Sequence, residues 1–307
     1  MDIFYLLFQN LIPLYILIAL GWIAGKFLNI DIKSIGALGI YVFMPIAVCG
    51  YIAQLDFKPI YAGLPIIVFC TITLLALSWL KFAKKIYPDY RANLLTMCAT
   101  WGNIGYFALP IVIALYPPEL VGVYMFMMAG TIFYEATIGY YIWMRGNLNI
   151  KQSLKKVIKF PSLYAIIIGL TFNYANYPFE GKLLTYWEYC RGAYIVIGMM
   201  IIGTALSKIK NLVIAPRFLS LAFLGKFIIW PLTTFTLIQI DIHLLKIFDQ
   251  TSHQMLFLLS TVPPGANIAA FAATLNMNPE KAATTVLIGT LLALFSVPLM
   301  LALSGLF

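Results

Sequence analysis

Two stretches of the sequence place asparagine, glycine and proline inside long apolar runs, where few polar side chains are expected. The later stretch reads Ser-Thr-Val-Pro-Pro-Gly-Ala-Asn over residues 260–267, and the earlier one reads Thr-Trp-Gly-Asn-Ile-Gly-Tyr over residues 100–106. Because proline and glycine cannot continue a regular helix, the backbone should break near the middle of each run. A helix that restarts after a break points the positive end of its dipole inward, where its free N–H groups can bind a carboxylate. The chemistry that these residues predict is therefore anion binding.

The two stretches also match in position. Asn103 and Asn267 each begin the pattern Asn-Ile-x-x-Phe-Ala, and a Pro-Glu step follows each of them, at residues 118–119 and 279–280. Backbone that breaks at membrane depth is tolerated only beside protein or a wet cavity, and interrupted helices at matching positions of two halves indicate a transporter's binding site. We expect Asn103 and Asn267 to cap the half-helices that restart there. The alternative, that both stretches are proline kinks without a ligand, remains open.

The composition is that of a membrane protein. Apolar residues make up 62% of the chain and charged residues only 10%, whereas soluble domains are about 45–50% apolar and about 25% charged. The net charge of +9 is explained by the positive-inside rule rather than by nucleic-acid binding. The four cysteines show no Cys-x-x-Cys spacing and are expected to be buried apolar residues. No basic segment precedes the first apolar run, so we expect that run to be a retained span.

The lengths of the apolar runs predict ten membrane spans. They cover roughly residues 5–28, 34–54, 60–82, 92–115, 119–144, 158–175, 189–207, 216–238, 255–275 and 282–305. Of the 20 lysines and arginines, only Lys58, Lys182, Arg191 and Lys246 fall in the even-numbered connections, and Lys226 lies within a span. The positive-inside rule then places the odd-numbered connections in the cytoplasm and both termini outside the cytoplasmic membrane.

The basic connection after the fifth span divides the chain into two halves of five spans each. An odd number of spans inserts the second half upside down relative to the first, which is the arrangement of an inverted repeat. The predicted organisation is a first repeat over residues 1–145, a cytoplasmic basic loop over 146–157 and a second repeat over 158–307. The predicted fold class is an all-α membrane protein with ten transmembrane helices, in which the broken helices four and nine approach each other and cross.

Two ionisable residues lie within predicted spans, where such residues are candidates for function. Glu135 is a candidate for proton coupling or gating, and a structural hydrogen bond is the alternative. Lys226 could pair with Glu135, attract an anionic substrate or extend its ammonium group to the membrane surface. His243 and His253 are isolated from other ligands, so we predict no metal site.

No enzyme motif is present in the sequence. It contains no His-Glu-x-x-His, no Gly-x-Ser-x-Gly and no phosphate-binding loop, so we predict neither an enzyme nor a cofactor. The two breaks also lack the adjacent carboxylates that a cation antiporter needs. An organic solute is therefore favoured over a bare cation.

The chain resembles the auxin efflux carrier family of secondary transporters, and within it the short prokaryotic members called malate permeases. The resemblance rests on Tyr-Val-Phe-Met-Pro-Ile at 41–46, on Gly-Asn-Ile-Gly at 102–105 followed by Leu-Pro at 109–110, and on Pro-Pro-Gly-Ala-Asn at 263–267. It implies a scaffold domain, a transport domain that contains the crossed helices, elevator-like movement and a homodimer.

The resemblance also implies where a substrate carboxylate binds. Asn103 and Asn267 become its polar contacts at the crossover. The other residues implied in this site are Gly102, Gly105, Pro110, Pro263, Pro264 and Gly265, together with Met44 and Pro45 from the second span.

The predicted function is alternating-access, elevator-type transport of a small organic anion, such as an auxin-like or malate-like carboxylate. The partners are the anion, the lipid bilayer and a second copy of the chain, and coupling to a proton or to sodium is left open. One alternative is a sodium-coupled symporter of the bile-acid type, for which Thr100, Ser260 and Thr261 could supply oxygen ligands. An alternative of another class is a membrane receptor that transports nothing.

Overall fold

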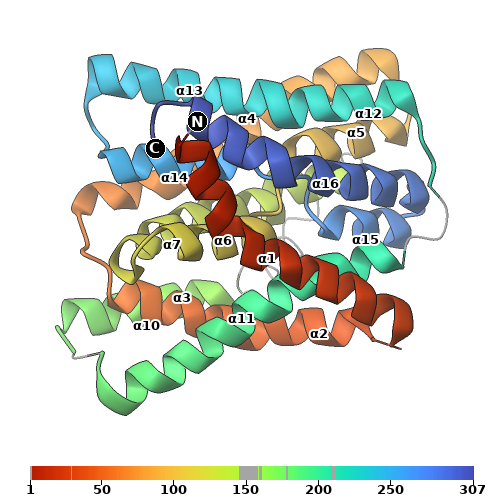
Figure 1. Cartoon of the computed structure of the whole chain (residues 1–307). Coiled ribbons are helices and arrows are strands. Elements are labelled where there is room, and N and C mark those ends of the chain that lie inside the picture. The colour runs from red at the N-terminus through yellow and green to blue at the C-terminus, as the bar shows by residue number, and fades with distance from the viewer. Residues whose placement is uncertain (1, 29, 145–157, 159–160, 178, 209–211) are drawn as a thin grey trace.

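The computed structural model describes residues 2–28, 30–144, 158, 161–177, 179–208 and 212–307, and these residues fold almost entirely into helices (Figure 1). Among them, seven stretches are long and apolar enough to cross a membrane. These are Phe8–Phe27, Ser34–Ala53, Pro59–Ile86, Pro118–Trp143, Gly181–Ser207, Pro216–Leu245 and Pro279–Leu303. The prediction of an all-α membrane protein is confirmed, whereas the number of ten spans stays a prediction. The predicted basic loop at 146–157 lies outside the described residues.

Five α-helices are long and ten are shorter. The long ones are α1 (Asp2–Phe27), α4 (Leu64–Ile86), α7 (Pro118–Tyr134), α11 (Gly181–Ser207) and α16 (Pro279–Leu303). The shorter ones are α2 (Ile32–Leu38), α3 (Met44–Ala53), α5 (Tyr90–Thr100), α6 (Leu109–Leu115), α8 (Tyr140–Trp143), α10 (Pro161–Tyr174), α12 (Pro216–Phe223), α13 (Trp230–Ile240), α14 (Gln250–Thr261) and α15 (Asn267–Thr274). A 3-10 turn, η2 (Pro59–Gly63), precedes α4, and π-helical turns occur at η1 (Gly39–Phe43), η3 (Ile104–Ala108), η4 (Glu135–Gly139), η5 (Leu224–Ile229) and η6 (Asp241–Leu245).

The π-helical turns coincide with residues that the sequence singles out. The turn η3 directly follows Asn103, η4 begins at Glu135 and η5 contains Lys226. A π-helical turn inserts one residue into the helical ladder and is found frequently at functional sites. These interruptions therefore change the direction in which side chains point near the predicted functional residues.

The seventh predicted span begins earlier than its apolar run indicates. The helix α11 starts at Gly181 and continues to Ser207, and its first turns carry Lys182, Glu188 and Arg191. Arg191 stacks on the ring of Trp187, with its guanidinium carbon 5.0 Å from the ring centroid. Charged residues at a helix end are accommodated in this way because their stems cover apolar surface while their charges stay near water.

The helices pack as two groups that meet along one boundary (Figure 1). In one group α1 packs on α11, α3 packs on α10, and α11 also contacts α2 and α3. In the other group α4 packs on α5 and α7, α12 packs on α5, and α16 packs on α14 and α15. Contacts of α3 with α7, of α1 with α16 and of α11 with η3 join the two groups. The residues of the candidate site lie at this last junction.

Small residues bring α1 and α11 unusually close together. A methyl group on Gly203 would collide with the carbonyl oxygen of Ile18, and one on Gly21 would collide with the carbonyl oxygen of Met200. The hydroxyl of Thr204 donates to the Gly21 carbonyl oxygen at 3.0 Å. Small and hydroxylated residues of this kind are the usual contacts between helices in membranes.

A polar cluster fixes the start of α14, the helix that leads into the later break. Asp249 caps α14 by accepting from the Ser252 N–H at 3.0 Å, and it also accepts from Lys58 at 2.8 Å and from the Tyr61 hydroxyl at 2.7 Å. Partial burial acts to raise the pKa of Asp249, but the hydrogen bonds from Lys58, Ser252 and Tyr61 outweigh it and hold that pKa well below its usual range. The cluster joins the segment before α4 to the start of α14.

The protein should lose stability in acid partly through Asp249. Because its pKa is depressed in the folded state, its contribution is fully present above the unfolded pKa of about 3.9 and is lost as the pH falls toward the folded value. We expect Asp249→Asn to melt at a lower temperature than wild type at neutral pH, and the difference to shrink below about pH 4. The exposed Asp56, changed to asparagine, is the control. A constant difference across the pH range would contradict this assignment.

Candidate functional site

The two broken helices meet through their backbones. Gly102 and Pro264 form an antiparallel bridge, in which the Asn103 N–H donates to the Pro263 carbonyl at 2.8 Å and the Gly265 N–H donates to the Trp101 carbonyl at 3.0 Å. The helix α5 ends at Thr100 just before the bridge, and α14 ends at Thr261. The groups freed by each break are thus satisfied by the other break, as a bilayer interior requires.

The local sequence explains this geometry. Val262 is extended because the following proline disfavours a helical residue before it, so α14 has to end there. Two glycines then permit the close approach of the chains. A methyl group on Gly102 would lie 2.8 Å from a methyl carbon of Val262, and one on Gly265 would lie 3.0 Å from Trp101.

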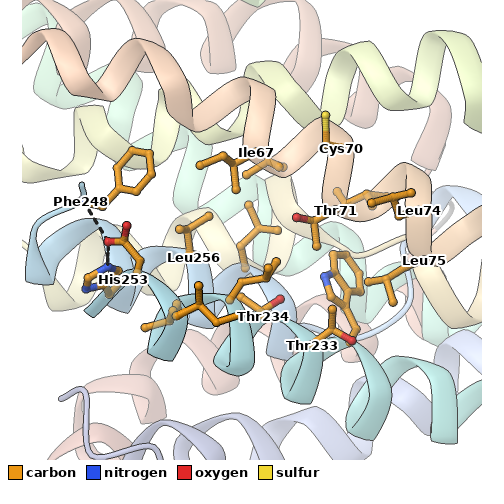
Figure 2. A pocket seen from close by; sticks show the side chains of 18 of the residues that line it. Ile67, Cys70, Thr71, Leu74, Leu75, Thr233, Thr234, Phe248, His253 and Leu256 are labelled. Atoms are coloured by element: carbon orange, nitrogen blue, oxygen red, sulfur yellow. Dashed lines mark hydrogen bonds and ion pairs between the residues drawn. The ribbon is translucent and has the colours of Figure 1, made fainter. Parts of the chain in front are cut away.

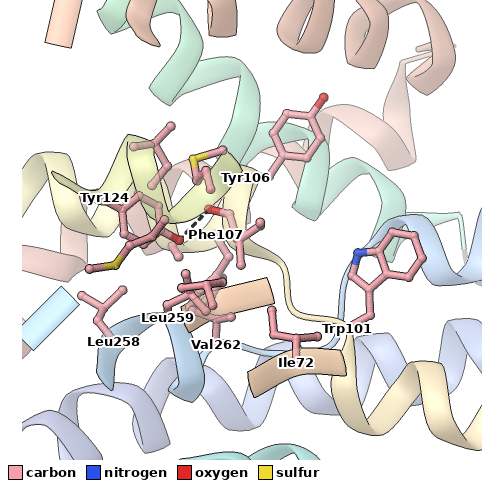
Figure 3. Packing of buried hydrophobic residues seen from close by; sticks show 14 of the residues in the cluster. Ile72, Trp101, Tyr106, Phe107, Tyr124, Leu258, Leu259 and Val262 are labelled. Carbon is pink, nitrogen blue, oxygen red and sulfur yellow. Dashed lines mark hydrogen bonds between the residues drawn. The ribbon is translucent and has the colours of Figure 1, made fainter. Parts of the chain in front are cut away.

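Buried side chains hold the crossover in place. Figure 3 shows Phe107 and Val262 packed near Tyr124, whose hydroxyl donates to the Ile104 carbonyl at 3.1 Å. Phe107, Val262 and Tyr124 are all fully buried. The start of η3, and with it Asn103, is therefore positioned by the core of the protein.

The two asparagines do not cap the half-helices, so that prediction is wrong. Asn103 precedes η3 but makes no capping bond, since its backbone angles of −81° and 69° belong to the bridge rather than to a helix start. Asn267 is the first residue of α15, and Ala266 before it is already helical, so no side chain caps this helix. Neither amide side chain therefore caps a helix.

The two asparagines differ in their surroundings. Asn103 is 5% exposed, and its side-chain nitrogen has no hydrogen-bond partner. Asn267 is exposed, although it lines the same pocket. A buried amide donor without a partner costs free energy. Asn103 is therefore the side chain at the crossover with an unmet requirement for an acceptor.

A cavity of about 80 Å³ adjoins the crossover. It collects the predicted site residues Met44, Gly102, Asn103, Gly105, Glu135, Gly265 and Asn267. The predicted residues Pro45, Pro110, Pro263, Pro264 and Lys226 do not line it. Pro263 and Pro264 act indirectly, by ending α14 and by fixing the backbone of the bridge. Pro110 fixes the backbone at the start of α6. The cavity therefore unites both breaks with the helix that contains Met44.

Aromatic residues that were not singled out from the sequence complete the lining of the cavity. Tyr106 and Tyr194 stack with their ring centroids 6.4 Å apart, and the Tyr194 hydroxyl donates to the Gly105 carbonyl at 2.7 Å. Trp101, the residue before Gly102 of the bridge, also lines the cavity. Trp101 and Tyr106 lie inside the earlier motif, so their proximity to Asn103 was the available signal. Tyr194 comes from α11, and no local pattern pointed to it.

The two ionisable residues differ in their surroundings, since Glu135 lines the cavity and Lys226 does not. Glu135 is partly exposed, lines the cavity and has the Trp101 indole as its neighbour. Lys226 is fully buried, and a methyl group on Gly102 would lie 3.0 Å from its Nζ. This Nζ lies 3.2 Å from the centroid of the Trp230 ring and has no hydrogen-bond partner. The predicted pairing of Lys226 with Glu135 is therefore not formed.

A larger cavity of about 540 Å³ lies between α4 and α13 and is almost entirely apolar (Figure 2). At one end the ring nitrogen of His253 lies 2.8 Å from the Asp241 carboxylate, which also accepts from the Ile247 and Phe248 N–H groups. Its outer wall includes exposed residues such as Cys70 and Leu74. Since this cavity offers no unpartnered donor to an anion among the residues described, the smaller one at the crossover is the better candidate.

Comparisons with known proteins show the family of the chain. The chain matches the family described as "Membrane transport protein" over residues 6–152 and 147–301. It is also similar to a protein of Methanocaldococcus jannaschii named "Uncharacterized transporter MJ1031", with 24% identity over 186 residues. That match covers 59% of this chain and 60% of the relative, so the chain spans less than two thirds of that protein. The chain belongs to the membrane transport protein family, which is the family of the auxin efflux carriers.

Proposed function

We propose that the protein carries a small organic anion across the cytoplasmic membrane and binds the anion's carboxylate at the crossover. The observation that carries this proposal is the buried Asn103 amide, whose donor lacks a partner beside the cavity. A carboxylate would satisfy this donor, and hydrogen bonds to charged groups are worth more than those between neutral ones. The starts of η3 and α15 lie at the same cavity and would add their dipoles.

The proposed architecture has ten spans in two inverted repeats, over residues 1–145 and 158–307. The seven long apolar stretches would supply seven of these spans. The interrupted pairs α5–α6 and α14–α15 and the short helix α10 would supply the other three. The antiparallel direction of the bridge between the two breaks supports inversion, since two equally oriented repeats would place these segments parallel. The distribution of lysine and arginine supports termini outside the cell.

The proposed movement is an elevator. The cavity is lined by Met44 and Tyr194 from one packing group and by Asn103, Glu135 and Asn267 from the other. A site at the boundary of two bodies can be exposed alternately when one slides past the other. We assign α1, α2, α3, α10 and α11 to the scaffold and the remaining helices to the transport body, with dimerisation through the scaffold as the family resemblance implies.

The cavity favours a short substrate. At about 80 Å³ it suits a compact carboxylate better than a bulky steroid-like anion, which weighs against the bile-acid-type alternative. Glu135 shares the cavity, so an ionised Glu135 would repel the substrate. We therefore propose Glu135 as the group that couples anion binding to a proton.

Thermal stability of the purified protein with a panel of ligands tests this function. The panel pairs malate, benzoate and indole-3-acetate with their neutral amides, each in sodium and in N-methylglucamine buffers. A ligand that binds the folded form at 100 times its Kd stabilises it by about 2.7 kcal/mol. We expect at least one carboxylate, but not its amide, to raise the melting temperature, and uptake of that carboxylate into proteoliposomes to be saturable. Equal shifts by acids and amides would contradict an anion site, and binding without uptake would favour the receptor alternative.

A further inference from the structure

We propose that Lys226 is the built-in counter-charge of the crossover site, which gives the site its preference for anions and removes any need for sodium. This inference rests on the proposed anion-carrier function and assigns a role to a residue that does not line the cavity. Lys226 Nζ lies close to Gly102, which lines the cavity, but Lys226 is not itself a lining residue. Its action on a bound carboxylate is therefore electrostatic, and Lys226 is a positioning residue rather than a contact.

No acid that could neutralise Lys226 lies on the described helices that pack against its turn. The turn η5 packs against α5, α12, α13 and α14. None of these four helices contains an aspartate or a glutamate in its sequence. The ring of Trp230 is the partner that the ammonium group does have, through a cation–π contact. Burial of an ammonium group without a counter-ion costs several kcal/mol. An anion bound at the crossover would supply the negative charge that the packed helices lack.

The nearest other charged groups face elsewhere. Glu135 lines the cavity beside Trp101, and Lys226 does not line it. Asp241 lies at the far end of α13 and is paired with His253 at 2.8 Å. No ion pair of Lys226 occurs among the residues that the structure describes. Within the described part of the chain no counter-charge for a protonated Lys226 is present, and a bound anion would provide one.

The buried side-chain groups without partners at the crossover are donors, which favours an anion over a sodium ion. The carbonyl oxygens of Trp101 and Pro263 accept from the partner break, and those of Asn103 and Gly265 accept from the helical turns that follow. The hydroxyls of Thr100, Ser260 and Thr261 donate to carbonyls of their own helices. Among the buried side-chain atoms described, those without a partner at the bridge are Asn103 Nδ2 and Lys226 Nζ, both donors. A protonated Lys226 beside a bound carboxylate would supply the positive charge that a cation would otherwise contribute.

The test compares wild type with Lys226→Met, which keeps the length of the side chain and removes its charge. Both proteins are titrated with malate, benzoate and indole-3-acetate and with their three amides, and binding is read from the melting temperature. We expect carboxylates to bind Lys226→Met at least about tenfold more weakly, because charges interact strongly across the poorly screening interior. Amide binding should not change, and the unliganded variant should melt no lower than wild type. Lys182→Met, at an exposed position, is the matched control for loss of one positive charge.

Each outcome separates this inference from the proposed function. A carboxylate preference that persists in Lys226→Met overturns the role of Lys226 and leaves the anion carrier standing. Parallel loss of acid and amide binding shows a structural role and likewise overturns it, as does a requirement of the wild type for sodium. Absence of any carboxylate preference in the wild type overturns both proposals. Should Lys226→Met not fold, Lys226→Gln is measured against the same criteria.

Discussion

Carboxylate binding should be lost when Asn103 is replaced by leucine, while the protein remains folded. The Asn103 side chain has no hydrogen-bond partner in the protein, so leucine breaks no internal bond and removes a buried polar group. A hydrogen bond to a charged group contributes about 1.5–3 kcal/mol, which corresponds to roughly a tenfold to hundredfold change in affinity. We expect a loss of that size in ligand-induced stabilisation and in proteoliposome uptake. Asn10→Leu, at an exposed position of α1, controls for the substitution.

The second asparagine sharpens this prediction. Asn267 lines the same cavity but is exposed, so its side chain can be hydrated in the absence of ligand. Its loss should therefore weaken binding less than the loss of Asn103, because a hydrogen bond that replaces water yields a smaller net gain. Normal binding in both Asn103→Leu and Asn267→Leu would show that the substrate does not bind at the crossover.

The breaks could be predicted because their causes are local. Pro263 removes its own amide donor and restricts Val262 before it, and these effects reach over few residues. That both breaks carry the Asn-Ile-x-x-Phe-Ala pattern made their pairing a reasonable expectation. The bridge between Gly102 and Pro264 brings the two breaks together.

The roles of the asparagine side chains could not be predicted in the same way. Capping was inferred from residue type, but the backbone of Asn103 is held by its bond to Pro263, a residue far away in the sequence. Which side chain remains unpartnered depends on such long-range bonds, and so does the arrival of Tyr194 at the cavity from α11. The placement of Lys226 close to Gly102 likewise follows from packing of η5 on α5 and α14. Sequence patterns specify where the backbone breaks, whereas tertiary packing decides what faces the break.

The largest effect on stability is expected from Gly203→Ala, at the contact of α1 with α11. The added methyl would collide with the Ile18 carbonyl oxygen and lie 2.6 Å from the Trp22 nitrogen, and both atoms belong to the backbone of α1. A side chain could rotate away, but here a whole helix has to move, and overpacking of this kind typically costs about 1–3 kcal/mol. We expect a clearly lower melting temperature for the purified protein.

The same helix provides the control for this prediction. A methyl group on Gly192 of α11 would meet no atom within 4 Å, so Gly192→Ala should be neutral or stabilising, by up to about 1 kcal/mol, because alanine favours the helix. The two variants share residue type, helix and substitution and differ only in the backbone that faces them. Equal melting temperatures would contradict the close packing of α1 on α11. Since neither glycine lines the crossover cavity, folded Gly203→Ala protein should still bind carboxylates, which separates the stability of the proposed scaffold from the chemistry of the site.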